Sequence, residues 1–307
     1  MVNLLDIVIV NWNGGELIKK TVNSLLQINH LEVLNKVYIV DNNSSDNSIN
    51  ELVTHEKIEV IKNNVNRGFG AACNQAIKKS SSKYFLLLNP DVVLFENSIY
   101  NSILFLESRN DLDILGVQQI DDDGKYVYSC SRFPTPWGVF TNALGLHKIL
   151  PKYFRSNILM TDYNYEKSGY VDQVMGAYMM IRSETVFKKI GIFDERFFDY
   201  REEADLSKKL NDYGGKTFYN SEIKIIHSGG GTTNQVKAFR LFLYLQSTLR
   251  YNKKHFSFWG SLVSNFITCT LEFTTRVIFC LLKGDFSGVK ETVTGYKYLI
   301  IKSKKYT

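Results

Sequence analysis

Residues 6–15 read D-I-V-I-V-N-W-N-G-G, a short apolar and β-branched run that ends in polar residues and a glycine pair. Such a run is typical of a buried strand, and the glycines end it. Glu16–Ile28 follows with apolar residues at helical spacing, and Lys36–Asp41 (K-V-Y-I-V-D) is a second strand-like run. Strand, helix and strand in this order predict a βαβ unit and therefore a parallel sheet.

The alternation continues along the chain. We expect strands at Ile58–Lys62 and Tyr84–Leu88, separated by a helix at Gly68–Ala76. The second half is expected to hold a strand-like run Val171–Ile181, helices Glu184–Ile190 and Asp205–Tyr213, and short strands Thr217–Tyr219 and Ile223–His227. Residues 126–170 have a weak pattern broken by prolines and are predicted to be irregular. The fold class is α/β, with a mixed, mostly parallel sheet flanked by helices.

The charge of the chain is unevenly distributed. The net charge is +6, yet residues 234–307 alone carry 12 Lys and Arg against 3 Asp and Glu. We therefore expect a catalytic domain over 1–232 and a basic, aromatic-rich helical extension over 233–307. The four cysteines are scattered without paired spacing, and Met1–Leu5 leads directly into the first strand. Neither a zinc site nor a secretory signal is expected, and a reducing cytoplasm fits this usage.

Polar residues follow the predicted strands. Asn11 and Asn13 come after the first strand, Asp41 and Asn43 after the second, and Asp91 after the fourth, in L-N-P-D. In parallel sheets ligands bind at the carboxyl ends of the strands, so a site is expected there. An acid such as Asp91 can hold Mg²⁺ or Mn²⁺ against phosphate oxygens. The alternative is that these residues only form turns and helix caps.

Three further segments carry candidate chemistry. Residues 66–74 (N-R-G-F-G-A-A-C-N) place glycines before a helix, which allows the backbone to approach phosphate, although a plain tight turn is equally compatible. Residues 193–206 crowd acids among aromatic rings, which favours a general base or simply a solvated helix start. His227 precedes Gly229–Gly231 and can ligate a metal or serve the structure alone. Residues 121–124 (D-D-D-G) are interpreted as a hairpin turn rather than a metal site.

The order of these motifs is more specific than any one of them. V-I-V-N-W-N-G, V-D-N-N-S-S-D-N-S, N-R-G-F-G-A-A-C-N, L-L-L-N-P-D, V-M-G-A-Y-M-M-I-R, G-I-F-D-E-R-F-F-D-Y-R-E-E-A-D-L and I-I-H-S-G-G-G closely resemble glycosyltransferase family 2. R-F-P at 132–134 and Q-S-T-L-R-Y at 246–251 resemble its O-antigen and cell-wall rhamnosyltransferases. The resemblance implies a GT-A fold, an inverting single displacement, and a divalent cation, Mg²⁺ or Mn²⁺.

The resemblance also implies residue roles. Glu203 would be the catalytic base, with Asp205 supporting the site. Asp91 would hold the metal, and His227 would be its second protein ligand or a diphosphate contact. The nucleotide-sugar set would be Asn11, Asn13, Asp41, Asn43, Arg67, Gly68 and Asn89. Two positions depart from the family pattern: Asn89 replaces the first acid of D-x-D, which implies weak metal binding, and Glu202-Glu203 replaces the usual Glu-Asp pair. The choice between Glu202 and Glu203 as base therefore stays open.

The resemblance favours dTDP-rhamnose as donor and a glycan or polyprenyl-diphosphate-linked acceptor. A UDP-hexose donor is the alternative within enzymes, and a non-catalytic nucleotide-sugar-binding protein is the alternative outside them. The basic, aromatic extension is typical of helices that bind an anionic membrane surface, although it can also pack on the domain. Leu262–Leu282 contains Glu272 and Arg276, which argues against a spanning helix. We expect a peripheral protein on the cytoplasmic face of a bacterial membrane, and no nucleic-acid partner.

Overall fold

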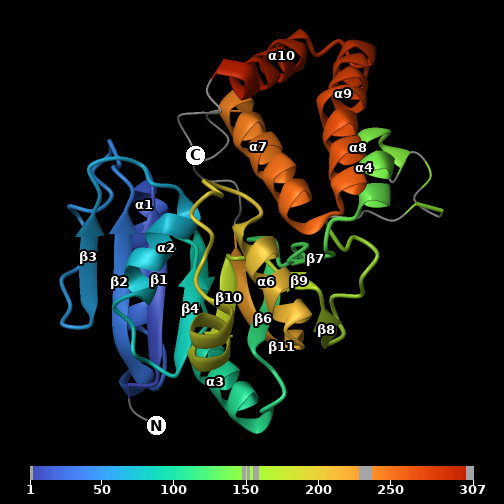
Figure 1. Ribbon diagram of the computed structural model, residues 1–307. Coiled ribbons are helices and arrows are strands. Elements are labelled where there is room, and N and C mark those ends of the chain that lie inside the picture. Colours follow the sequence, from blue (N-terminus) through green and yellow to red (C-terminus); the bar gives the residue numbers. More distant parts are fainter. Residues whose placement is uncertain (1–2, 147–149, 151–152, 155–158, 228–236, 302–307) are drawn as a thin grey trace.

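The computed structural model describes residues 3–146, 150, 153–154, 159–227 and 237–301 (Figure 1). One mixed sheet dominates them, in the order β3-β2-β1-β4-β10-β6-β11-β5. Its first half is parallel and consists of β1 (Leu5–Asn11), β2 (Leu34–Asp41), β3 (Ile58–Lys62) and β4 (Tyr84–Leu88). These strands confirm the four predicted from the sequence.

The second half of the sheet is where the strand direction changes. β10 (Tyr178–Arg182) runs antiparallel between β4 and β6 (Ile114–Ile120), and β11 (Thr217–His227) is parallel to β6. β5 (Val92–Leu94) and β8 (Gly169–Val171) both pair antiparallel with β11, while β7 (Cys130–Ser131) and β9 (Gln173–Val174) form a separate ribbon. The predicted mixed, mostly parallel class is thus correct.

Helices cover both faces of the sheet, because successive strand residues point to opposite sides. Ile7 and Ile9 of β1 pack on one face, which is covered by α1 (Gly15–Leu26) and α3 (Ser98–Ser108). Val8 points to the other face, which is covered by α2 (Phe69–Ile77) and α6 (Glu202–Asp212). A 3-10 turn (Leu31–Val33) precedes β2, and a π-helix (Glu184–Ile190) confirms the short helix expected there.

Three predicted elements differ from the structure. Helix α6 begins at Glu202 rather than Asp205, because Arg201 ends the preceding turn and its carbonyl accepts the Asp205 amide at 2.8 Å. The run Val171–Ile181 is divided into the end of β8, β9 and β10 rather than one strand. The two strands expected over 217–227 form one strand, β11, with a register shift between Asn220 and Lys224.

The D-D-D-G segment is a turn, as predicted. The Gly124 amide donates to the Asp121 carbonyl at 2.9 Å, and the Asp121 carboxylate accepts the amides of Asp123 and Lys125. The described residues of the predicted irregular stretch that follows include the strand β7 and a short helix, α4 (Pro136–Ala143).

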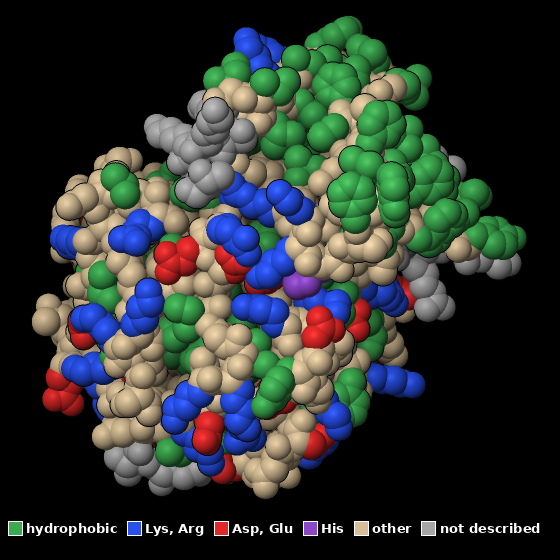
Figure 2. All heavy atoms as spheres, viewed as in Figure 1, with side chains coloured by type: hydrophobic (Ala, Val, Ile, Leu, Met, Phe, Trp, Pro, Cys, Tyr) green, Lys and Arg blue, Asp and Glu red, His purple; other side chains and the backbone are tan. Residues whose placement is uncertain are grey.

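The C-terminal extension is helical, as predicted, and lies at the top of the view in Figure 1. It comprises α7 (Lys237–His255), α8 (Phe258–Cys269), α9 (Leu271–Leu282) and α10 (Phe286–Ile301). α10 packs back on α7 and α9, and α4 packs on α8. Figure 2 shows hydrophobic side chains gathered over this part of the molecule.

Within the described part of the chain, one helical stretch is long and apolar enough to cross a membrane by length and composition. It is Phe258–Leu282, which joins α8 and α9 at Thr270, and 6% of its span is buried in the fold. The two charges noted from the sequence, Glu272 and Arg276, pair with each other at 2.7 Å.

Candidate functional site

A pocket of about 510 Å³ opens where the parallel strands end, and its wall includes α7. Its lining includes residues at the ends of β1, β4 and β11, in the loop before α6, in the first turn of α6, and in the first turns of α7, together with residues of α1, α2, β7 and β9. They are Val10, Trp12, Gly14, Leu17, Asn42, Asn66, Gly68, Phe69, Asn89, Pro90, Asp91, Ser131, Gln173, Met175, Ala177, Phe198, Asp199, Tyr200, Arg201, Glu202, Glu203, Ala204, His227, Phe239, Arg240, Leu243 and Tyr244.

Asn11 and Asp41 lie side by side because the register of β1 and β2 pairs them. The Asn11 amide donates to an Asp41 oxygen at 3.0 Å, and the Ser44 hydroxyl donates to the same oxygen at 2.6 Å. Both residues are buried and neither lines the pocket. Asp41 therefore shapes the loop after β2, and Asn42, which follows it, reaches the pocket.

Asn13 and Asn43 occupy left-handed backbone conformations, with φ of +54° and +64°. The Asn13 side-chain oxygen accepts the Ser45 amide at 2.7 Å, which joins the loops after β1 and β2. Neither residue lines the pocket, and neither does Arg67, which is exposed. Of the predicted nucleotide-sugar set, the structure thus brings Gly68 and Asn89 to the pocket wall and leaves the others behind or beside it.

Gly68 joins the two sides of the pocket. Its φ is +84°, and a Cβ added there would lie 2.1 Å from the Phe198 carbonyl oxygen, so only glycine fits. The next amide, of Phe69, donates to that carbonyl at 2.8 Å, and Asn42 donates to the Gly68 carbonyl at 3.1 Å. The glycine-rich loop is therefore a tight contact with the acid-bearing loop as well as a candidate phosphate contact.

Asp91 and His227 meet because β11 pairs His227 with Val92, directly after Asp91. His227 Nε2 lies 3.3 Å from Asp91 Oδ1, and Nδ1 lies 2.8 Å from the Gln119 side-chain oxygen. A ring that donates from Nδ1 presents the Nε2 lone pair to the space beside Asp91, as metal-ligating histidines do.

The residues present fit a divalent cation held jointly with a ligand. Apart from its 3.3 Å contact with His227 Nε2, Asp91 Oδ1 is buried without a hydrogen-bond partner among the described residues. The same residues contain no group of three or more His, Cys, Asp or Glu side chains that can hold a metal. One carboxylate and one imidazole leave coordination positions for diphosphate oxygens and water, which suits Mg²⁺ or Mn²⁺.

Three further carboxyl groups belong to the lining, on Asp199, Glu202 and Glu203. Burial, and then the charges of Glu203 and Asp199, raise the pKa of Glu202 well above its usual range. Glu202 is 2% exposed, and its Oε2 has no hydrogen-bond partner in the described part of the chain. These effects favour the protonated, neutral form of the Glu202 carboxyl group.

Glu203 is less enclosed than Glu202. Burial raises the pKa of Glu203, but its own backbone amide, that of Gly176, and the charge of Arg201 oppose the rise. A Cβ at Gly176 would lie 2.5 Å from Glu203 Oε1, so this glycine leaves room for the carboxylate. Burial and the Glu203 charge raise the pKa of Asp199 to about 7. The Glu203 charge raises the pKa of both neighbours, whereas the Arg201 charge favours ionised Glu203, which makes Glu203 the candidate base.

The backbone before α6 is strained. Tyr200 and Arg201 are consecutive non-glycine residues with φ of +66° and +70°, a conformation that costs free energy and clusters at functional sites. Helix α7 holds this turn: the Ser247 hydroxyl donates to the Asp199 carbonyl at 2.7 Å, and the Arg201 guanidinium donates to the Tyr244 hydroxyl at 3.1 Å. The Q-S-T-L-R-Y stretch thus contacts the acid-bearing loop directly.

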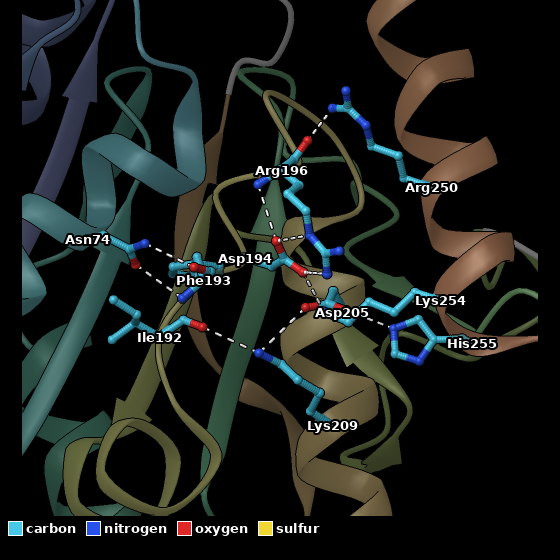
Figure 3. Close-up of polar contacts among 10 residues, drawn as sticks. All are labelled: Asn74, Ile192, Phe193, Asp194, Arg196, Asp205, Lys209, Arg250, Lys254 and His255. Atoms are coloured by element: carbon cyan, nitrogen blue, oxygen red, sulfur yellow. Dashed lines mark hydrogen bonds and ion pairs between the residues drawn. The ribbon is translucent and has the colours of Figure 1, made fainter. Parts of the chain in front are cut away.

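Asp205 is not among the residues that line the pocket. It is fully buried, and its Oδ1 lies 2.7 Å from both Lys254 Nζ and His255 Nε2 at the end of α7 (Figure 3). Lys254 also binds Asp194 at 2.6 Å. These contacts, not burial, lower the pKa of Asp205, so it is a charged brace between α6 and α7. A role of Asp205 in the chemistry itself stays a prediction.

Sequence reasoning missed several residues of the site. Asp199 lies inside the acid-rich motif but was not among the predicted site residues. Gly176 lies inside the strand-like run Val171–Ile181 and was not among them either. Phe239, Arg240, Leu243 and Tyr244 of α7 line the pocket although they belong to the predicted extension. Their only signal was the Q-S-T-L-R-Y resemblance a few residues further along the same helix.

Comparisons with known proteins bear on the family and on the fold. Residues 6–191 match the model of the family described as Glycosyl transferase family 2. The chain is 25% identical over 276 residues to an N-acetylglucosaminyl-diphospho-decaprenol L-rhamnosyltransferase of Mycobacterium tuberculosis, covering 84% of this chain and 87% of the relative. It is 28% identical over 209 residues to the low-salt glycan biosynthesis hexosyltransferase Agl10 of Haloferax volcanii, covering 67% of this chain and 61% of that relative.

Among solved structures, the fold is similar to a mannosyltransferase from Pyrobaculum calidifontis in complex with GDP-Man and Mn²⁺. The TM-score is 0.55 at 10% sequence identity, and the match covers 100% of this chain and 84% of that one. At this identity the likeness concerns the fold alone, and it confirms the predicted GT-A fold with C-terminal helices.

Proposed function

Because the chain belongs to glycosyl transferase family 2, we propose that it is an inverting transferase that moves L-rhamnose from dTDP-rhamnose to a lipid-linked or polysaccharide acceptor. The observation that supports this best is the pocket itself, in which a base candidate, Glu203, shares one lining with the diphosphate-side residues Gly68, Asn89 and Asp91. A protein that only binds nucleotide sugars needs no such base. The rhamnosyltransferase among its relatives supports the sugar.

In this proposal Glu203 takes the proton of the acceptor hydroxyl as that oxygen attacks the anomeric carbon of the donor. The nucleotide diphosphate leaves from the opposite face, so the configuration inverts. Glu202 stays neutral behind the base, and Asp199 contributes a second carboxyl whose pKa is raised to about 7. Asp91 and His227 would hold Mg²⁺ or Mn²⁺, which, when bound, neutralises charge on the leaving diphosphate.

A UDP-hexose is the second candidate donor, and the similarity to an archaeal hexosyltransferase supports it. We expect dTDP-rhamnose, in the presence of Mn²⁺, to raise the melting temperature of the protein more than UDP-glucose, UDP-galactose or GDP-mannose does, because a ligand that binds only the folded state stabilises it by mass action. Thermal-shift measurement with and without Mn²⁺ checks this, and release of dTDP on incubation with a glycan acceptor checks transfer. A larger rise in melting temperature with a UDP-hexose than with dTDP-rhamnose would identify the UDP-hexose as the donor.

We further propose that the protein docks peripherally on the cytoplasmic face of an anionic bacterial membrane. The support is an apolar surface on α4 and α8–α10, shown in green at the upper right of Figure 2. Its exposed residues are Trp137, Phe258, Trp259, Leu262, Val263, Phe266, Ile278, Phe279, Leu281, Leu282 and Phe286. Two aromatics of the extension are packed instead: Phe256 lies against Tyr251, and Phe273 against Tyr296.

Replacing Phe258, Trp259 and Phe266 together by serine should abolish sedimentation of the protein with anionic vesicles. These side chains are 75%, 70% and 68% exposed, so their loss removes lipid contact with little effect on folding. The matched control replaces Val53 and Val65, exposed apolar residues of the N-terminal half, by serine and should leave sedimentation unchanged. Undiminished sedimentation of the α8 triple variant would reject this surface.

A further inference from the structure

The pocket continues beyond the proposed base onto α7. Four residues in the first two turns of this helix line it: Phe239, Arg240, Leu243 and Tyr244. The strand ends already provide the diphosphate-side residues of the proposed donor site. A base must face the acceptor hydroxyl, so the wall that α7 adds is the part of the pocket left for the acceptor.

This α7 wall is cationic where it meets the acid-bearing loop. Arg240 lines the pocket and is solvent-exposed, so it lies at the mouth. It is close enough to Asp199 to favour the charged form of that carboxyl. Arg201 lies over the Tyr244 ring, with its guanidinium carbon 5.2 Å from the ring centroid, and donates to Tyr244 and Thr248. Two guanidinium groups therefore border the same end of the pocket.

The wall is also apolar. Phe239 and Leu243 line the pocket together with Arg240. A ligand that suits these features carries a phosphate group for the arginines and a hydrocarbon chain for the apolar side chains. Guanidinium groups bind phosphates in a forked geometry that lysine does not reproduce.

We propose that Arg240, assisted by Arg201, binds the diphosphate of a polyprenyl-diphosphate-linked acceptor. The proposal rests on the proposed transferase function for its biological meaning, but the subsite itself is a property of the pocket. One sugar ring separates the reacting hydroxyl from the diphosphate in such an acceptor. The diphosphate-binding residue should therefore line the same pocket as Glu203, as Arg240 does.

The test measures binding of farnesyl diphosphate to the full chain after the donor site has been saturated with dTDP and Mn²⁺. Arg240→Gln should weaken this binding at least about tenfold, the usual effect of losing a hydrogen bond to a charged group. Arg240→Lys should recover only part of the loss. The matched control is Lys237→Gln, which removes a positive charge from the same turn of α7 but outside the pocket lining, and it should bind as the wild type does.

Transfer assays separate the two proposals. With a prenyl-diphosphate-linked N-acetylglucosamine as acceptor, Arg240→Gln should raise the acceptor KM at least about tenfold and leave the donor KM unchanged. With an alkyl glycoside of the same sugar, the variant and the wild type should have equal KM. Arg240-dependent binding of farnesyl diphosphate without any sugar transfer would reject the function and keep the subsite. Equal binding by Arg240→Gln and wild type, or equal losses in Arg240→Gln and Lys237→Gln, would reject the subsite.

Discussion

Replacing Glu203 with glutamine is expected to lower the rate of sugar transfer by about 10²–10⁴-fold, the usual contribution of a general base. Glutamine keeps the size of the side chain beside Gly176 but cannot accept the acceptor's proton. Donor binding is proposed to depend on Gly68, Asn89 and Asp91 instead, and it should stay nearly unchanged. Steady-state kinetics and titration with the nucleotide sugar measure the two effects separately.

The matched control is Glu202→Gln. Glu202 is buried, and burial and the neighbouring charges raise its pKa well above the usual range, which favours its protonated form. An amide then replaces a neutral carboxyl group of the same shape, and we expect a much smaller loss of rate. If Glu202→Gln lost the activity while Glu203→Gln kept it, the roles of the two residues would be exchanged.

The rate of sugar transfer by the wild type should depend on pH in a definite direction. A base works only when deprotonated, so the rate should rise with pH through the pKa of Glu203 and then level off. Burial raises this pKa, which displaces the acid limb toward neutral pH. Glu203→Gln should lose the limb in its residual activity.

The sequence predicted the first half of the fold because its strands are continuous apolar runs between glycines and polar turns. Ile58–Lys62 and Tyr84–Leu88 coincide with β3 and β4. In the second half, short strands are formed by pairing between distant segments: β5 exists because Val92–Leu94 meets the end of β11. No local pattern carries that information, and the same pairing is what brings His227 to Asp91.

The sequence analysis grouped candidate site residues that lie close together in the sequence. Such residues share a site when they follow the end of a strand, but not when they lie on different faces of a helix. Asp205 lies two residues after Glu203 on α6, and residues at this spacing point to different faces because each residue advances about 100°. With Glu203 in the pocket, Asp205 must face elsewhere, and it meets Lys254 and His255 instead. Arg240 and Tyr244 were not predicted because they lie far from Glu203 in the sequence, and only folding brings α7 to the pocket.

Replacing Asp91 with asparagine should remove both transfer and the binding of Mn²⁺ in the presence of a nucleoside diphosphate. Asp91 provides the one carboxylate of the predicted metal pair, and apart from its contact with His227 its buried Oδ1 has no hydrogen-bond partner among the described residues. Because Asn89 stands where an acid would share the charge, no neighbouring carboxylate in L-N-P-D can compensate. The loss should amount to several kcal/mol of transition-state stabilisation.

Electron paramagnetic resonance of Mn²⁺ added to the protein with dTDP measures metal binding without reference to activity. The control is Asp123→Asn in the D-D-D-G turn. There the Asp123 carboxylate pairs with Lys125, and the Asp123 amide donates to the Asp121 carboxylate within the hairpin turn. This variant should bind Mn²⁺ as the wild type does, since the turn is a structural feature and not a metal site. Normal Mn²⁺ binding by Asp91→Asn would show that the cation is held elsewhere, and the pairing of His227 with Asp91 would then be an ordinary buried contact between β11 and the residue before β5.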